Sequence, residues 1–255
     1  MIIDIHTYIG KWPHWPLPVS STSGWVETLA REGVDTAVIC STRSLFVSWE
    51  DGNREAEDAV SKHPKRLLAF ACLGPTEFSH KLAGASLDFD SYDARGFRGI
   101  RLYPQYHSYH PLYEPFVERV CQAAEVRSWP VFLPLRAVMN WGAPTIELNW
   151  MVDLVERFPR TQWILAGINY FQELRVAIQL MRRHPSVHLE TSCVQGFNGI
   201  EKLVQECGSR QVLFGSGAPL QCLGAGLQKV LHANLADPDR EAILGGNARQ
   251  LLHLG

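Results

Sequence analysis

Charged and polar residues interrupt the apolar runs of this chain at a few points, and these points are where chemistry could occur. Asp4 and His6 alternate with isoleucines near the start of the chain, so a strand there would place the carboxylate and the imidazole on one face. Such a pair makes a general base with its orienting group, or two ligands. Glu190 lies in another apolar run and needs a partner if it is buried. Arg101 and Arg136 are natural partners for Glu190 or for an anionic substrate, because a guanidinium binds carboxylates through paired hydrogen bonds.

A segment rich in tyrosine and histidine follows one of the apolar runs. Residues 103–110 contain three tyrosines and two histidines, whereas a loop that is merely solvated would be richer in small polar residues. We therefore predict that Tyr103 and Tyr106 contact substrate, and that His107 acts with His6 in acid–base catalysis. The alternatives for this segment are an aromatic lid and a subunit contact.

Two further residues complete the candidate substrate site. Asn169 and Ser216 each follow an apolar run directly. Cys193 also follows such a run, but we interpret it as a plain thiol because the sequence indicates no nearby histidine to activate it. Neither a P-loop nor a dinucleotide-binding glycine motif occurs, and the glycine–serine–glycine turn at 215–217 is by itself a weak phosphate signal.

Eight short apolar runs predict the strands that would position these residues. They cover residues 2–6, 36–40, 67–73, 99–103, 131–135, 162–166, 187–191 and 211–215. Amphipathic segments between them predict helices over residues 24–32, 53–62, 112–125, 145–157, 171–183 and 200–207. Several of these helices end at a proline, which a helix cannot pass. The connection around residues 86–93 is weak, and residues 238–254 read as a closing helix interrupted at Gly245 and Gly246.

Alternating strands and helices of this kind predict a (β/α)8 TIM barrel formed as a single domain over residues 1–255. The length fits, because such barrels typically take about 250 residues. Active sites of these barrels lie at the C-terminal ends of the strands. All the candidate residues named above fall on or just after a predicted strand, so we expect them at one rim of the barrel.

Composition excludes several classes of protein. Lys and Arg number 24 against 26 Asp and Glu, a net charge of −2, which argues against a non-specific nucleic-acid binder. No signal peptide or run of about 18 apolar residues occurs, so we expect no membrane contact and a cytoplasmic protein. The six cysteines are scattered singly, which favours reduced thiols. The expected partners are a small-molecule substrate and, because many metabolic barrels associate, a second copy in a homodimer.

Several short motifs occur in an order and spacing that are specific when taken together. They are Ile-Asp-Ile-His at 3–6, Gly-Phe-Arg-Gly-Ile-Arg-Leu-Tyr-Pro at 96–104, Glu-Thr-Ser at 190–192, Val-Leu-Phe-Gly-Ser at 212–216 and Ile-Leu-Gly-Gly-Asn-Ala at 243–248. In these the chain resembles the amidohydrolase superfamily, in particular the amidohydrolase-related (amidohydrolase 2) branch close to aminocarboxymuconate semialdehyde decarboxylase. The likeness spans almost the whole chain. It implies a TIM barrel with hydrolase or decarboxylase chemistry.

The same resemblance implies a divalent metal, often zinc, that this chain is poorly equipped to bind. Metal-dependent members carry His-x-His on strand 1, histidines ending strands 5 and usually 6, and an aspartate after strand 8. Here only His6 is retained. Tyr8, Arg136, Gly167 and Gly217 stand at or beside the other positions. One histidine cannot hold a catalytic zinc that needs about three protein ligands.

We therefore expect a barrel enzyme, a hydrolase or a decarboxylase or related lyase, that acts without the usual zinc on a small, carboxylate-bearing metabolite. His6, His107, Glu190 and Asp4 are the candidate catalytic residues. The predicted substrate-binding residues are Arg101, Tyr103, Tyr106, Arg136, Asn169 and Ser216. One alternative is a non-catalytic protein that keeps the pocket for ligand binding or assembly. Another is a metal-dependent hydrolase with altered ligands, such as zinc held by His6, His107 and Glu190.

Overall fold

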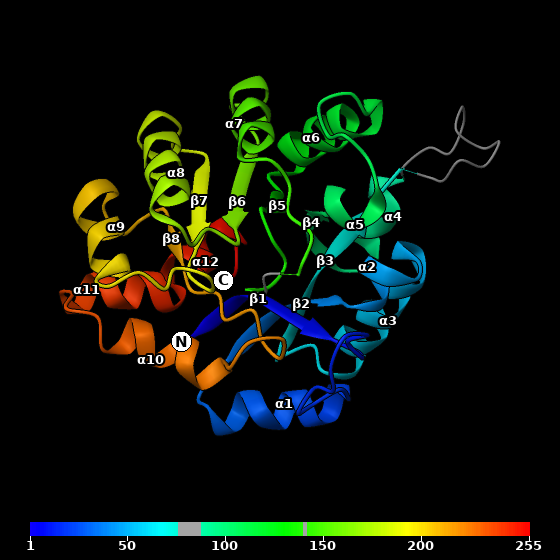
Figure 1. The fold of residues 1–255 in the computed structure, drawn as a ribbon. Helices are drawn as coiled ribbons and strands as arrows, with labels where there is room; N and C mark the ends of the chain where they lie inside the picture. The colour runs from blue at the N-terminus through cyan, green and yellow to red at the C-terminus, as the bar shows by residue number, and fades with distance from the viewer. Residues whose placement is uncertain (76–87, 140–141) are drawn as a thin grey trace.

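Eight parallel strands form the centre of the molecule, and helices surround them (Figure 1). The computed structural model describes residues 1–75, 88–139 and 142–255. The strands are β1 (Ile3–Ile9), β2 (Thr36–Ser41), β3 (Leu67–Leu73), β4 (Phe97–Leu102), β5 (Pro130–Pro134), β6 (Gln162–Ala166), β7 (Val187–Glu190) and β8 (Val212–Leu213). They pair in sequence order. The backbone N–H of Ile5 donates to Phe214 O at 3.0 Å and that of Tyr8 to Ala218 O at 2.8 Å, so the chain after β8 closes onto β1. The predicted (β/α)8 barrel is confirmed.

The helices alternate with the strands as the sequence predicts. They are α1 (Thr22–Arg31), α2 (Arg43–Phe46), α3 (Trp49–Lys62), α4 (Phe89–Ala94), α5 (Pro104–His107), α6 (Pro115–Arg127), α7 (Leu148–Arg157), α8 (Phe171–Arg183), α9 (Gly199–Cys207), α10 (Leu223–Leu231), α11 (Asp237–Glu241) and α12 (Asn247–Leu251). Part of the weak connection predicted around residues 86–93 lies outside the described residues, and its remainder belongs to α4. The closing helix is interrupted as expected, by a π-helical turn at Ala242–Gly246.

Three helices are absent from the sequence-based prediction. The short helices α2 and α5 each occupy a single turn, and α10 contains two glycines, which lower helix propensity. Residues 103–110, which were predicted to form a loop, therefore begin with a helical turn. Pro104 at the first helical position provides the φ angle that starts this turn.

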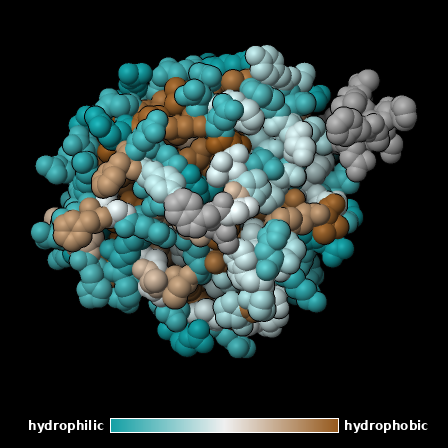
Figure 2. All heavy atoms as spheres, in the orientation of Figure 1, coloured by the Kyte–Doolittle hydropathy of each residue, from teal (hydrophilic) through white to brown (hydrophobic). Residues whose placement is uncertain are grey.

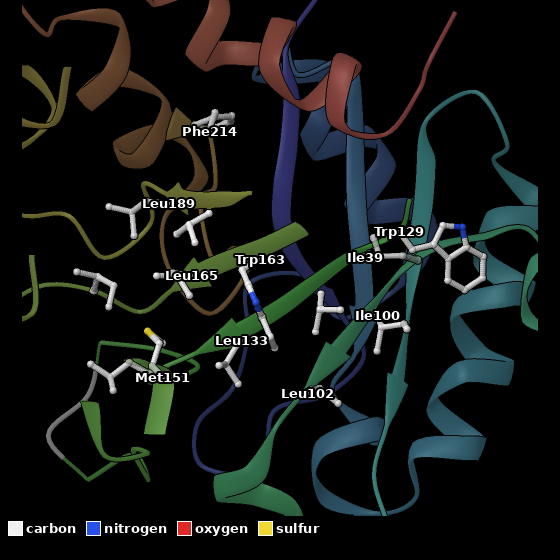
Figure 3. Close-up of a cluster of buried hydrophobic side chains, with 14 of the residues drawn as sticks. Ile39, Ile100, Leu102, Trp129, Leu133, Met151, Trp163, Leu165, Leu189 and Phe214 are labelled. Carbon is white, nitrogen blue, oxygen red and sulfur yellow. The ribbon is translucent and has the colours of Figure 1, made fainter. Parts of the chain in front are cut away.

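Along each strand, alternate side chains point to two different apolar layers, one between the strands and the helices and one inside the barrel. On β5 and β6, Leu133 and Leu165 point outward to the helices, where Trp163 and Met151 pack with them (Figure 3). Phe132, between two outward residues, points into the barrel instead. This period of two is what a parallel strand buried on both faces requires.

β1 departs from this alternation at the point where it carries the site. Ile3 and Ile5 belong to one cluster inside the barrel, and Tyr8, three residues after Ile5, belongs to a second one. The pairing of β1 with β2 shifts register between Asp4 and Thr7, which accounts for the change of parity. The expectation that Asp4 and His6 share a face is therefore wrong, because the irregularity rotates one relative to the other.

The two ends of the barrel interior are filled differently. At the N-terminal end, Ala248, Leu251 and Leu252 of the closing segment pack against the inward residues of the strands. The C-terminal end holds a second cluster of buried residues. It consists of Tyr8, Trp12, Cys40, Leu45, Cys72, Tyr103, Ala137, Val138 and Leu220. Most of these come from β-strand ends and from the loops that follow them, so the rim that should carry the site is covered by side chains.

On the face seen in Figure 2, hydrophilic residues predominate around the edge and hydrophobic residues form smaller groups. Among the phenylalanines that the structure describes, Phe171 at the start of α8 and Phe197 before α9 are the most exposed, at 70% and 92%. Among residues 1–75, 88–139 and 142–255, no helix is long and apolar enough to cross a membrane.

Candidate active site

His6 lies inside the barrel between two acceptors and one donor. Its Nδ1 is 3.3 Å from Glu190 Oε1 and 3.3 Å from Ser192 Oγ. Its Nε2 is 3.0 Å from the Tyr8 hydroxyl. Ser192 itself donates from Oγ to Glu190 Oε1 at 2.7 Å and from its backbone N–H to Oε2 at 2.7 Å. Of the two roles considered for Arg101 and Arg136, the ion pair with Glu190 is not formed, because the Glu190 carboxylate pairs with His6 instead.

Tyr8 extends this cluster across the barrel. Its hydroxyl is 3.1 Å from the Tyr103 hydroxyl, which accepts from Arg101 Nη1 at 3.3 Å. A guanidinium can only donate and an ionised carboxylate can only accept, so the two ends fix the direction of every bond between them. Protons point from Arg101 through Tyr103 and Tyr8 to Nε2 of His6, and Nδ1–H points to Glu190.

Arg101 is fully buried on β4 and is held mainly by backbone and aromatic groups. Nη2 donates to Ile5 O at 3.2 Å and to Val38 O at 3.0 Å. The Phe132 ring lies beneath the guanidinium carbon at 4.6 Å. Within the described part of the chain, Arg101 forms no ion pair with a carboxylate.

Burial by itself shifts the pKa values of His6 and Glu190 in opposite directions. Burial lowers the pKa of His6, which Glu190 only partly counteracts. Burial alone would raise the pKa of Glu190, but the charge and hydrogen bond of His6 and the two bonds from Ser192 together lower it. The cluster therefore combines an ionised carboxylate with an imidazole that favours its neutral form, which is the arrangement of a general base with its orienting group.

The Asp4 side chain supports the backbone around the site and is not a partner of the His6 imidazole. Its Oδ1 accepts from the backbone N–H of His6 at 3.1 Å and of Ser216 at 3.0 Å. The Ser216 Oγ accepts from the Ala218 N–H at 3.0 Å, which fixes the turn after β8. Burial raises the pKa of Asp4 to about 7, against the opposing effect of Ser216 and the His6 amide. Asp4 thus ties β1 to the loop after β8.

His107 and Tyr106 lie on the β4 side of the rim, away from His6. His107 Nε2 donates to Ser44 O at 2.8 Å, while its Nδ1 has no hydrogen-bond partner among the described residues. Burial lowers the pKa of His107, and the Ser44 carbonyl raises it only in part. The Tyr106 hydroxyl is also buried without a partner in this part of the structure, and burial raises its pKa to about 12.

Arg136 is engaged by a neighbouring helix. Its guanidinium forms two bonds with Glu173 of α8, at 2.8 and 2.5 Å, and donates to Gly167 O. The same Glu173 carboxylate accepts from the Asn169 N–H at 2.8 Å. Burial alone would raise the pKa of Glu173, but Arg136 and two backbone amides lower it. Arg136 and Asn169 therefore meet at Glu173, and Gly167, whose carbonyl accepts from Arg136, links them to the His6 cluster by donating its N–H to Glu190 Oε1 at 3.3 Å.

The family model described as amidohydrolase matches residues 47–254. The chain belongs to the amidohydrolase family. No curated protein sequence matches it.

Solved structures with the same fold cover almost the entire chain. A 2,6-dihydroxybenzoate decarboxylase from Rhizobium is 16% identical, with a TM-score of 0.73, and covers 99% of this chain and 98% of its own. A dihydroxybenzoic acid decarboxylase from Polaromonas, with bound manganese, is 16% identical, with a TM-score of 0.71 and coverage of 99% and 97%. A probable 2-pyrone-4,6-dicarboxylic acid hydrolase from Acinetobacter baumannii is 14% identical, with a TM-score of 0.70 and coverage of 99% and 99%. These likenesses show the barrel fold.

The amidohydrolase residues at the rim do not fit a divalent metal. A Cβ at Gly167, whose φ is +71°, would collide with the backbone of Arg136, and a Cβ at Gly217, with φ +70°, would collide with the Gln221 amide. Tyr8 stands where a second histidine ligand would be, and its hydroxyl donates to the imidazole of His6, the one ligand that is retained. No group of three or more His, Cys, Asp or Glu side chains suited to a metal occurs in the described segments. We therefore derive no catalytic step through a metal.

From the sequence, Tyr8 was identified only as a residue that replaces a metal ligand, and its contacts with His6 and Tyr103 were not predicted. The signal was available, because Tyr8 follows His6 by two residues and shares its face of β1. Cys40 and Cys72 were interpreted only as reduced thiols, and the structure shows that both point into the barrel. Cys193 lies beside the site, and burial raises its pKa to about 11, so it stays a thiol near neutral pH.

Proposed function

We propose that this amidohydrolase-family barrel is an enzyme that acts on a small carboxylate-bearing molecule, with its own side chains in place of the family's metal. The observation that carries the proposal is the directed hydrogen-bond chain from Arg101 through Tyr103 and Tyr8 to His6 and Glu190. It joins a cation, two phenols, an imidazole and a carboxylate at the C-terminal end of the barrel, which is where such folds perform chemistry.

Each end of this chain has a distinct chemical capacity. Arg101 and the Tyr103 hydroxyl offer donors suited to a carboxylate. His6, with Glu190 holding Nδ1–H, can accept a proton at Nε2 and return it. Tyr8 lies between them and can pass that proton. Loss of carbon dioxide from a carboxylate needs one proton returned to the carbon left behind, and hydrolysis needs one removed from water.

The structural neighbours support the substrate class. A 2,6-dihydroxybenzoate decarboxylase and a probable 2-pyrone-4,6-dicarboxylic acid hydrolase share this fold. Their compounds are small rings bearing carboxylates. We infer that the substrate here is of the same kind, bound with its carboxylate toward Arg101. His107, Tyr106, Arg136, Asn169 and Ser216 stay predictions as further contacts.

A panel of aromatic mono- and dicarboxylates in chelator-treated buffer tests the proposal. Compounds that raise the melting temperature are then assayed for product and for release of carbon dioxide. We expect at least one stabilising compound to be converted, and we expect His6→Gln to lower kcat at least a hundredfold, because one acid–base group contributes about that factor. The matched control is His232→Gln, an exposed histidine at the end of α10, which should leave turnover unchanged.

A second candidate is a non-catalytic member of the family, and the covering of the site favours it. His6, Tyr8, Arg101 and Glu190 are each 0% exposed, and both imidazole nitrogens already contact protein groups. A binder of this kind would show stabilisation by a carboxylate without any product. Equal turnover in wild type and His6→Gln would remove the imidazole from the mechanism.

A further inference from the structure

Lys229 of α10 is a half-buried cation that the proposed chemistry does not use. Its Nζ donates to Thr191 O at 2.5 Å and to Ser192 O at 3.2 Å, in the turn that directly follows β7. The other four lysines that the structure describes are exposed. Ordering a lysine side chain costs up to about 2 kcal/mol of rotamer entropy. The two hydrogen bonds therefore hold this ammonium in one place against that cost.

One face of α10 brings the ammonium to this turn. Gly226 lies so close to the loop after β8 that an added Cβ would be 3.3 Å from Ser216. Lys229 follows Gly226 by three residues, so the two share a face of the helix. The lysine side chain thus extends from the point where α10 approaches the barrel most closely toward the end of β7.

The peptide group between Thr191 and Ser192 connects Lys229 to Glu190. A trans peptide is planar, and its C=O and N–H point in opposite directions. The Thr191 carbonyl accepts from Lys229, and the Ser192 N–H of the same peptide donates to Glu190 Oε2 at 2.7 Å. The peptide dipole therefore lies between a cation and a carboxylate, where each of its two hydrogen bonds strengthens the other.

Ser192 holds both oxygens of the Glu190 carboxylate. Its N–H donates to Oε2, and its hydroxyl donates to Oε1 at 2.7 Å, the oxygen that also faces His6 Nδ1. Lys229 binds the carbonyls on both sides of the Ser192 Cα. A rotation of this turn would withdraw the amide and the hydroxyl from the carboxylate together, and Lys229 prevents that rotation.

We propose that Lys229 is a positioning residue that acts on Glu190 through the Thr191–Ser192 peptide, and through Glu190 on the imidazole of His6. The ammonium fixes the two carbonyls of the turn. The turn then presents the Ser192 amide and hydroxyl to the carboxylate that orients the imidazole. Lys229 performs this role from the helix layer outside the strands, without contact with His6 or with a substrate.

The charges around Lys229 are consistent with this assignment. Burial lowers the pKa of Lys229, and the charge of Glu190 opposes this effect. The two bonds from Ser192 are among the interactions that lower the pKa of Glu190 against its burial. An ammonium can only donate hydrogen bonds, and Lys229 is the donor in both of its bonds to the turn.

The first test replaces Lys229 with methionine, which keeps an unbranched side chain and removes the ammonium. The readout is the backbone amide proton of Ser192 in nitrogen–proton spectra at pH 7.5. We expect a far-downfield resonance in wild type, because this N–H donates to a carboxylate at short distance, and an upfield move in Lys229→Met. The matched control is Lys202→Met, at an exposed lysine of α9, which should leave the resonance in place. A folded Lys229→Met that keeps the wild-type Ser192 resonance overturns the proposal.

Turnover of a compound from the carboxylate panel gives a second readout. We expect Lys229→Met to lower kcat about tenfold, because a small displacement of a catalytic group can cost up to about a hundredfold. KM should change less than about twofold, because Lys229 does not touch the substrate. A raised KM with an unchanged kcat overturns the positioning role.

A measurement on unmodified protein covers the case in which Lys229→Met does not fold. Nitrogen-15 spectra of the lysine ammonium groups in wild type should contain one slowly exchanging signal. That signal should show a coupling across its hydrogen bond to the carbonyl carbon of Thr191. Lysine signals that all exchange as fast as those of the exposed side chains overturn the proposal without any variant.

The effect on turnover rests on the proposed function, whereas the link from Lys229 to Glu190 does not. If no compound of the panel is converted and the Ser192 amide still moves in Lys229→Met, the proposed function is contradicted and the link is supported. Equal turnover of a confirmed substrate by wild type and Lys229→Met overturns the positioning role and leaves the proposed function in place.

Discussion

The Tyr8 side chain connects the two halves of the site. Its hydroxyl donates to His6 Nε2 and accepts from Tyr103, and it is fully buried. A buried hydroxyl with two good partners contributes more than its size suggests, because removing it leaves both partners unsatisfied. Tyr8 therefore keeps the hydrogen-bond chain continuous between Arg101 and His6.

Replacing Tyr8 with phenylalanine should interrupt this chain at its centre. We expect Tyr8→Phe to lower the free energy of unfolding by about 1–3 kcal/mol, since two buried groups lose a partner. We also expect it to lower kcat on a confirmed substrate. Urea unfolding measures the first effect, with Tyr113→Phe as the control at a tyrosine that is 81% exposed. Equal stability of the two variants would contradict the hydrogen-bonding role.

Asp4 carries a pH dependence of the opposite sign to that of an ordinary surface carboxylate. Its pKa is raised by burial from 3.8 to about 7, so between these values the folded state binds more protons than the unfolded state. Stability from this group is therefore greatest at low pH and falls as the pH rises to about 7. A complete shift corresponds to about 4 kcal/mol at most.

We expect Asp4→Asn to remove this dependence while its side-chain oxygen still accepts from the two backbone amides. Urea unfolding at pH 5 and pH 7.5 measures the change. Wild type should lose more stability than Asp4→Asn over this interval, because the shifted pKa of Glu190 is common to both proteins. The same slope in both would show that Asp4 titrates in its ordinary range.

At the scale of elements, the ion pair of Arg136 with Glu173 holds the end of β5 against the start of α8. Both side chains are largely buried, at 9% and 11% exposed. Breaking a buried pair leaves one charge unmatched, which typically costs 3–5 kcal/mol. The pair also closes the turn after β6, because Glu173 accepts from the Asn169 amide.

Glu173→Gln should therefore lower the free energy of unfolding by about 3 kcal/mol. The matched control is Glu118→Gln, which breaks the pair with Arg157 where both side chains are 49% exposed. That exposed pair should contribute less than about 1 kcal/mol. Similar losses in the two variants would show that Arg136 finds another partner.

The turn after β6 is built around a glycine that leaves no room for a ligand side chain. Gly167 has φ +71° and lies against the backbone of Arg136. We expect Gly167→Ala to destabilise the fold by about 1–3 kcal/mol, because it adds both strain and a collision. Gly196→Ala is the control, since nothing lies within 4 Å of its added Cβ. Thermal unfolding of the pair should separate them, and equal melting temperatures would contradict the close packing at Gly167.

For the whole molecule, the donor set at the rim leads to an expectation of metal independence, in contrast to the manganese-bound structural neighbour. A metal that binds the folded state stabilises it in proportion to the logarithm of its concentration. Because the donor set does not fit, we expect added zinc or manganese and added chelator to leave the melting temperature unchanged within about 1 °C. A clear rise with one metal, abolished by His6→Gln, would establish an altered metal site.

The fold was predictable because its pattern is local. Alternating strands with helices that stop at prolines require neighbouring parallel strands, and the short motifs carry the family resemblance. Candidate residues such as His6, Arg101 and Glu190 were found for the same reason, since a charge in an apolar strand is visible in the sequence.

The pairing of those residues depended on tertiary structure. A register shift in β1 places Asp4 and His6 on different faces of the strand, and no local sequence pattern predicts such a shift. Glu190 pairs with the His6 imidazole and not with an arginine. The two residues are 190 − 6 = 184 positions apart in the chain, and they meet only inside the barrel. The sequence by itself determined the barrel and the types of group at its rim. Only the closed barrel decided which of them touch, because strand order and register fix distances that sequence spacing does not contain.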